Sequence, residues 1–157
     1  MEEITRMIKP IWTIEHHEAF LRKACLPIAD ICFEKAAQVL EDLADTFATL
    51  PAGSAVGLAA PQIGYPFRIF ILFYQGLEVR AVNPELVTCK GSHLVKEGCL
   101  SIPDKTFTLK RPDVVKVRYV DLGQNVRSIR GHGVTAQALL HEMEHLDGIL
   151  VDTKGRS

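Results

Sequence analysis

The sequence predicts an α+β fold, in which mainly antiparallel sheets pack around a central helix that carries a His-Glu-x-x-His motif. Segments rich in β-branched and aromatic residues fill the middle of the chain. A helix with an apolar stripe at helical spacing is expected before them, at residues 33–50. A second helix is expected after them, at residues 135–148. Strands with a helix on each side are typical of an α+β domain.

The first strands follow the first helix. Residues 67–74 predict a strand, a Gln-Gly turn lies at 75–76, and residues 77–82 form the return strand. The run Asn-Pro-Glu-Leu at 83–86 is expected to break that return strand.

The second half of the chain ends in the motif-bearing helix. Extended segments are expected before this helix at residues 94–103, 114–120 and 126–130, and a turn is expected at residues 121–125. Gly-His-Gly at 131–133 then leads into the helix. Thr135 is the expected N-cap and Gly148 the expected C-cap of this helix.

Length and composition predict one domain over residues 1–157, with residues 1–20 as an N-terminal extension. Hydrophobic residues make up 47% and charged residues 24%, as in ordinary globular proteins. The net charge is -1, and no basic run indicates direct nucleic-acid binding. Apolar runs such as 69–73 are too short to span a membrane. Four irregularly spaced cysteines and the lack of a signal-peptide pattern indicate a reducing, cytoplasmic location.

The motif itself can build a metal site. His141 and His145 are four residues apart, so on a helix both imidazoles face the same side. Glu142 can reach past the metal to a water whose pKa the metal lowers, and can take its proton. The alternative is a surface helix with solvated side chains. A common zinc-protease third ligand is not nearby, so another ligand must come from elsewhere in the chain.

Two other segments could contribute to such a site. Residues 55–64 are small, apolar and glycine-containing, which lets the backbone approach another group closely. Gln62 adds an amide that can donate or accept a hydrogen bond. The alternative for this run is a tight buried connection. Cys99, in the short extended segment, could be a metal ligand or a buried inert thiol.

Three segments resemble, in this order, the signature motifs of the peptide deformylases: Gly-Leu-Ala-Ala-Pro-Gln at 57–62, Glu-Gly-Cys-Leu-Ser at 97–101 and His-Glu-Met-Glu-His-Leu-Asp-Gly at 141–148. The resemblance covers about residues 20–152. It implies a metallohydrolase that removes the formyl group from N-formyl-methionyl nascent peptides.

The resemblance also implies roles for individual residues. Cys99 would join His141 and His145 as third ligand of one divalent ion, with Fe(II) as the metal in the cell and Zn(II), Ni(II) or Co(II) possible after isolation. Glu142 would activate water and then protonate the leaving amine. The oxyanion donors would be the side chain of Gln62 and the backbone N–H of Leu100. The implied substrate-binding residues are Val56, Gly57, Gly98 and Gln137.

Several positions depart from the family pattern. Ala55 replaces a usual glycine, Leu140 a glutamine and Glu144 an aspartate, and Gln137 lies where an apolar residue is usual near the methionine pocket. The C-terminal helix of typical members is expected to be absent. A monomer with transient ribosome contact is expected.

Two alternatives to an active deformylase follow from the sequence. One is a related hydrolase with an altered substrate, which Ala55 and Gln137 motivate. The other is a non-catalytic, metal-stabilised binding protein. Glu142 and Gln62 argue against the second, because a structural metal site needs neither.

Overall fold

The computed structural model describes residues 7–29 and 32–156 of the chain. Residues 1–6 of the predicted N-terminal extension therefore lie outside the described residues. The helices are α1 (Ile14–Leu21), α2 (Phe33–Ala48), the 3-10 helix η2 (Ala60–Ile63), α3 (Gly133–Leu146) and α4 (Val151–Lys154). The strands are β1 (Gly57–Ala59), β2 (Ile69–Tyr74), β3 (Leu77–Lys90), β4 (His93–Cys99), β5 (Ile102–Arg111), β6 (Val114–Val120) and β7 (Val126–His132). Within the described ranges, no helix is long and apolar enough to cross a membrane.

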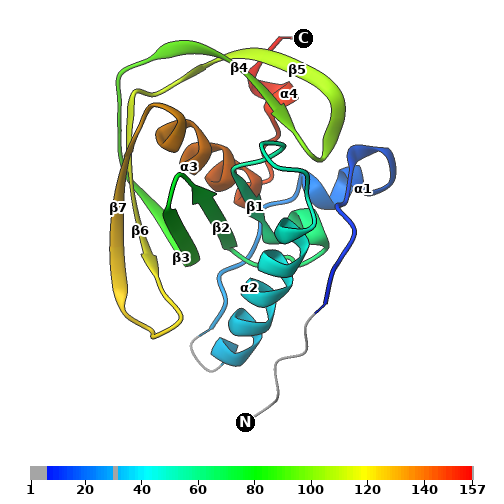
Figure 1. The fold of residues 1–157 in the computed structure, drawn as a ribbon, viewed down its shortest axis with the longest axis vertical. Coiled ribbons are helices and arrows are strands. Elements are labelled where there is room, and N and C mark those ends of the chain that lie inside the picture. The colour runs from blue at the N-terminus through cyan, green and yellow to red at the C-terminus, as the bar shows by residue number, and fades with distance from the viewer. Residues whose placement is uncertain (1–6, 30–31, 157) are drawn as a thin grey trace.

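The strands form two antiparallel sheets (Figure 1). The larger sheet has five strands in the order β1-β2-β3-β6-β7, and the smaller consists of β4 and β5. Helix α3 packs against the larger sheet and also contacts β5. The predicted α+β class with antiparallel sheets is confirmed.

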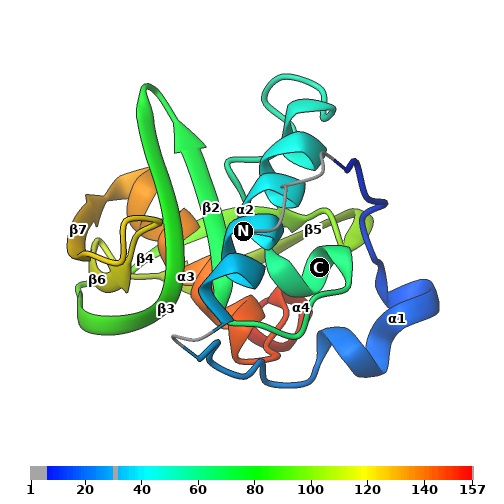
Figure 2. The same cartoon turned by 90° about the horizontal axis from the view of Figure 1, so that it is seen from below.

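Strand β2 is buried on both faces because α2 and α3 cover opposite sides of it (Figure 2). Phe70 and Leu72 belong to the core cluster that contains Leu139 of α3. Their neighbours Ile69 and Ile71 point the other way and belong to the cluster around α2. Alternation along a strand explains this division, and burial on both faces explains why the strand is apolar throughout.

The predicted break at residues 83–86 is wrong, because β3 continues through it to Lys90. The pairing with β6 shifts register between Val82 and Glu85, so a bulge accommodates the proline at position 84. Asn83 adopts a positive φ of 48° there. Its side chain accepts from the N–H and donates to the carbonyl of Ile28, at 2.9 and 2.8 Å. These two bonds hold the bulge in place.

Two further boundaries differ from the predictions. Residues 94–103 are not one extended segment but belong to β4 and β5, which a tight turn at Leu100 and Ser101 separates. Helix α3 begins at Gly133 rather than after Thr135. Gly133 has a φ of 54°, which lets the chain turn directly from β7 into the helix.

The C-terminal end of α3 agrees with the predicted role of Gly148. This residue follows the C-cap Asp147 and has a left-handed φ of 74°. Its N–H donates to the carbonyl of His145 at 3.1 Å, and the N–H of Ile149 donates to that of Glu144 at 2.9 Å. This pair of bonds is a Schellman motif, which ends the helix directly after the second histidine.

Candidate metal centre

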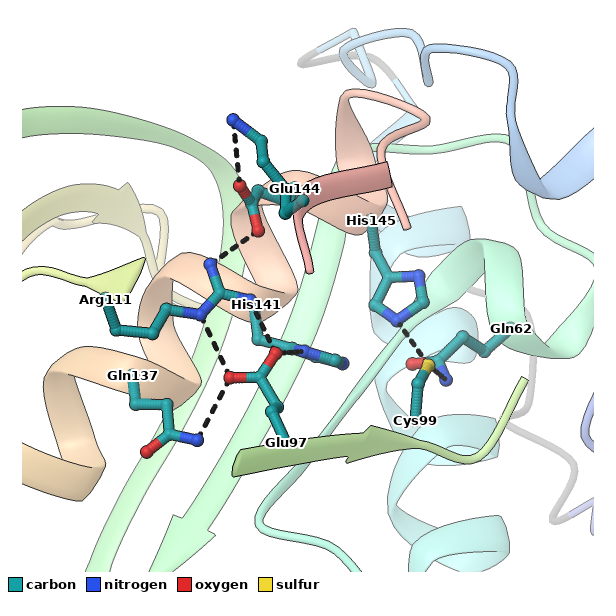
Figure 3. Close-up of polar contacts among 9 residues, drawn as sticks. Gln62, Glu97, Cys99, Arg111, Gln137, His141, Glu144 and His145 are labelled. Carbon is teal, nitrogen blue, oxygen red and sulfur yellow. Dashed lines mark hydrogen bonds and ion pairs between the residues drawn. The ribbon is translucent and has the colours of Figure 1, made fainter. Parts of the chain in front are cut away.

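A cysteine and two histidines converge where the small sheet meets α3 (Figure 3). One possible ligand atom from each of Cys99, His141 and His145 lies within 4.8 Å of the other two. The Sγ of Cys99 is 3.3 Å from Nε2 of His145. Among the described residues, this is the group of side chains able to hold a metal ion.

The fold brings these side chains together from two elements. Cys99 is the last residue of β4, where a register shift after Glu97 precedes the tight turn into β5. His141 and His145 share one face of α3 because they are four residues apart. Arg68 donates from Nη1 to the carbonyl of Leu146 at 3.0 Å, which anchors the end of the helix beside His145.

The charges in this cluster suit a cation. Burial alone would raise the pKa of the Cys99 thiol, but the charges and hydrogen bonds of the two histidines hold it well below its ordinary value. The thiolate is the form that binds metals. Burial would lower the pKa of His141, but Cys99 and Glu97 raise it well above its ordinary value. The surroundings of the His141 ring thus favour positive charge at this point.

The donor set fits a divalent transition metal or zinc. One thiolate and two imidazoles are borderline-soft ligands that suit Zn(II), Fe(II), Co(II) and Ni(II). Three protein ligands leave a tetrahedral position for a water or substrate, as catalytic sites require. The buried carboxylate of Glu142, next to His141 in sequence, gives such a position an acid–base neighbour.

Glu142 has an enclosed and incompletely paired carboxylate. Its residue is 2% exposed, and its buried Oε1 has no hydrogen-bond partner among the described residues. Burial raises the pKa of this carboxyl. A carboxylate with a raised pKa is a stronger base than an exposed one. A buried polar atom without a partner indicates a place for a water molecule or a substrate group.

Gln62 points its amide nitrogen towards the cysteine. Its Oε1 accepts from the N–H of Ala59 at 3.0 Å, which fixes the orientation of the amide. Its Nε2 therefore lies 3.9 Å from Sγ of Cys99 and donates to Oγ of Ser101 at 3.3 Å. The predicted alternative, a tight buried connection, is also partly true, because Gln62 is itself 2% exposed.

A buried ion network supports His141 from behind. Nδ1 of His141 is 2.5 Å from Oε2 of Glu97. Arg111 donates to both oxygens of Glu97, at 2.9 and 2.5 Å, and to Oε1 of Glu144 at 2.5 Å. Burial would raise the pKa of Glu97, but hydrogen bonds from His141 and Arg111 lower it to about 2. With Nδ1 engaged by Glu97, the Nε2 of His141 is the nitrogen left for a metal.

Sequence reasoning did not find this network. In sequence, Glu97 stands out only as the first residue of a motif, and Arg111 ends β5, most of which the sequence does not predict. Glu144 is buried and paired, with its Oε2 also 3.7 Å from Nζ of Lys154 on α4. Glu97 was the one signal in the sequence that could have indicated this network. It lies two residues before Cys99, and metal-binding histidines commonly donate their second ring N–H to a nearby carboxylate.

The predicted site residues surround one cavity of about 640 Å³. His145 is 1% exposed and is not a lining residue, but its Nε2 is 3.3 Å from Sγ of Cys99, which is one. The other nine line the cavity: Val56, Gly57, Gln62, Gly98, Cys99, Leu100, Gln137, His141 and Glu142. The structure thus brings together all ten residues that the sequence singled out.

Comparison with known proteins identifies the family. Residues 8–155 match the family model of the polypeptide deformylases. The chain belongs to this family. The family resemblance of the three motifs is therefore confirmed.

Individual members of the family are similar over most of their length. The peptide deformylase of Caldanaerobacter subterraneus subsp. tengcongensis is 40% identical over 130 residues, which are 83% of this chain and 79% of that protein. The crystal structure of the Thermotoga maritima peptide deformylase superposes with a TM-score of 0.85 at 27% identity, covering 97% of this chain and 100% of that one. A Met-Ala-Ser-bound class I type b peptide deformylase from Acinetobacter baumannii gives a TM-score of 0.84 at 25% identity and covers 96% and 99%.

Proposed function

We propose that this chain is a metal-dependent peptide deformylase that hydrolyses the N-terminal formyl group of formyl-methionyl peptides. One observation carries the proposal: the ligand atoms of Cys99, His141 and His145 converge at a cavity that the buried carboxylate of Glu142 also lines, and one oxygen of that carboxylate has no hydrogen-bond partner among the described residues. Its family membership supports the reaction, and the Met-Ala-Ser bound to the Acinetobacter relative supports a peptide substrate with methionine first.

The proposed ligands of one divalent ion are Cys99, His141 and His145. In this view α3 is the central helix that carries the metal-binding His-Glu-x-x-His motif. Fe(II) is the proposed metal in the cell, with Zn(II), Ni(II) or Co(II) able to replace it in isolated protein. When bound, the ion supplies a Lewis acid that polarises water and the formyl carbonyl.

Glu142 is the proposed acid–base residue. Its carboxylate accepts a proton from the water that attacks the formyl carbon. The same carboxyl then gives this proton to the nitrogen as the C–N bond breaks, so formate and the free amine leave. The raised pKa that burial gives Glu142 suits both steps, because a base that must also donate works best near the operating pH.

Gln62 and Leu100 are the proposed donors to the negative oxygen that forms during attack. The amide of Gln62 is held by Ala59 with its nitrogen towards Cys99, so it need not reorient during the reaction. The backbone N–H of Leu100 would donate from the turn that follows Cys99.

The proposed substrate-binding wall consists of Val56, Gly57, Gly98 and Gln137, all of which line the cavity. Gly57 leaves room for the Glu142 carboxylate, since an added Cβ would lie 2.6 Å from its Oε2. Gln137 makes the wall less apolar than a methionine pocket requires, which favours an altered first-residue preference as the second candidate function.

Non-catalytic metal binding is the weaker alternative. A structural metal needs neither an unpaired buried carboxylate nor an oriented amide beside it. We further propose a single catalytic domain that acts as a monomer in the cytoplasm and contacts ribosomes transiently, because its substrates would be nascent chains.

The test is metal analysis of anaerobically purified protein together with formate release from a formyl-Met-Ala-Ser peptide. The acetylated peptide serves as the control for general amide hydrolysis. We expect one metal per chain, formate release from the formyl peptide and no acetate release from the acetylated peptide. Metal-loaded protein that releases no formate from any formyl peptide would contradict the proposal. Release that is faster from peptides with another first residue would favour the second candidate.

A further inference from the structure

Gln137 does more than line the cavity. It lies on α3 one turn before His141, and its Nε2 donates to Oε1 of Glu97 at 3.0 Å (Figure 3). The other oxygen of the same carboxylate is 2.5 Å from Nδ1 of His141. One carboxylate on β4 therefore bonds two residues of the same helix, one turn apart.

This arrangement fixes the carboxylate from two sides. Arg111 donates to both oxygens of Glu97 from β5, and Gln137 and His141 each contact one of them from α3. Each oxygen thus has two partners. Rotation of the carboxylate, or rotation of α3 relative to β4, would break at least one of these hydrogen bonds.

The orientation of Glu97 matters because it determines the direction of the His141 ring. A histidine that donates through Nδ1 to a fixed acceptor has its Nε2 held in one direction. Nε2 of His141 must point towards Cys99 and His145 to complete the cluster. If the carboxylate of Glu97 can rotate, the ring of His141 can rotate with it and Nε2 loses its fixed direction.

We propose that Gln137 is a positioning residue of the metal centre: by holding Glu97 it orients His141 towards Cys99 and His145. This inference rests on the proposed function, since it concerns the same centre. The nitrogen of the amide is committed to Glu97. The side chain thus presents its remaining polar surface to the cavity while it supports the ligand set.

Two variants separate this role from the polarity of the cavity wall. Gln137→Met keeps the length of the side chain but removes the donor and makes the wall apolar. Gln137→Asn keeps the amide but is one methylene shorter, so its nitrogen no longer reaches Glu97. The matched control is Val134→Ala, because Val134 is also on α3 and lines the cavity.

The readouts are the dissociation constant for Co(II), the visible absorption of the Co(II) form, and kcat and KM for formyl peptides. We expect both Gln137 variants to bind Co(II) about tenfold more weakly, with a changed spectrum and a lower kcat. First-residue preference should sharpen only in Gln137→Met. Val134→Ala should bind Co(II) as the unaltered protein does.

Unchanged Co(II) affinity and spectrum in both folded variants would overturn the proposal. A change in Gln137→Met alone would also overturn it, because wall polarity and not the contact with Glu97 would then be responsible. Melting temperatures of the metal-free proteins establish folding, and the polar Gln137→Asn variant carries the comparison if Gln137→Met is unstable. Failure of the proposed function appears separately, as absent formate release by the unaltered protein.

Discussion

The carboxylate of Glu142 lies against the backbone of Gly57, so closely that a Cβ atom at position 57 would be 2.6 Å from Oε2. The same Cβ would lie 2.8 Å from the backbone carbonyl oxygen of Ile71 on β2. We expect Gly57→Ala to displace the carboxylate, because backbone on the other side cannot yield easily. Formate release should fall at least tenfold while metal content stays normal. The control is Ser54→Ala, because Ser54 also lines the cavity. Gly53→Ala would not serve, because Gly53 has a positive φ that alanine adopts only with strain. Full turnover in Gly57→Ala would show that the carboxylate does not need its present position.

Cys99 and Cys89 provide a matched pair for the ligand assignment. Cys99→Ala removes the thiolate, so metal and activity should be lost together. Cys89→Ala changes an exposed thiol on β3 and should leave both unchanged. Metal analysis and formate release of the two variants check this. A Cys99→Ala protein with one metal per chain and full turnover would remove Cys99 from the ligand set.

Arg111 should matter for stability more than an arginine at the end of a strand ordinarily does. It is 2% exposed and is the shared partner of Glu97 and Glu144. Arg111→Met would remove the cation that the two buried carboxylates share, which costs about 3–5 kcal/mol of unfolding free energy. Arg118→Met, at an exposed pair with Glu85, should cost less than about 1 kcal/mol. Urea unfolding of both variants gives the comparison, and equal costs would mean that the buried network adds no stability.

Trp12 joins the N-terminal segment to the site. Its backbone N–H donates to the carbonyl of Gln62 at 2.7 Å. Its indole ring lies on Gly64 and stacks with the ring of His17. Two residues later, Ile14 donates to the carbonyl of Ser101 at 3.0 Å. The segment thus ties η2 to the turn after Cys99.

We expect Trp12→Ala to cost about 1–2 kcal/mol of stability, since a half-buried ring is lost. It should also lower kcat more than it raises KM, because without the ring that packs on Gly64 the adjacent η2, which carries Gln62, would be held less firmly. Thermal melts and steady-state kinetics test both parts, with Glu15→Ala as an exposed control on α1. A stability loss with unchanged kcat would mean that the segment braces the fold and not the oxyanion donors.

Local sequence signals were sufficient for α3 and for β2. The spacing of His141 and His145 predicts their common face, and the apolar run of β2 predicts a buried strand. The strand β3 could not be read past Pro84, because the bulge that accommodates it depends on pairing with β6 and on the bonds of Asn83 to Ile28. Local residue types do not reveal such long-range partners.

The ion network that supports His141 could not be predicted from the sequence for the same reason. Arg111 is 14 residues from Glu97 and 33 from Glu144, and in sequence all three look like ordinary surface charges. Glu144 is buried and paired with Arg111, so Glu144→Gln is expected to lower the free energy of unfolding. Gln137 was assigned to the substrate wall alone because its partner Glu97 lies on another element.

Glu142 is the residue on which the proposed reaction depends most directly, since it is offset from the two histidines on α3 and has a buried oxygen without a partner among the described residues. The decisive measurement is formate release by Glu142→Gln, with metal content and melting temperature determined on the same sample. We predict one metal per chain, an intact fold and a rate lowered by about 10²–10⁴-fold, because the proton has lost its positioned carrier. Near-normal formate release from metal-loaded Glu142→Gln would contradict the account.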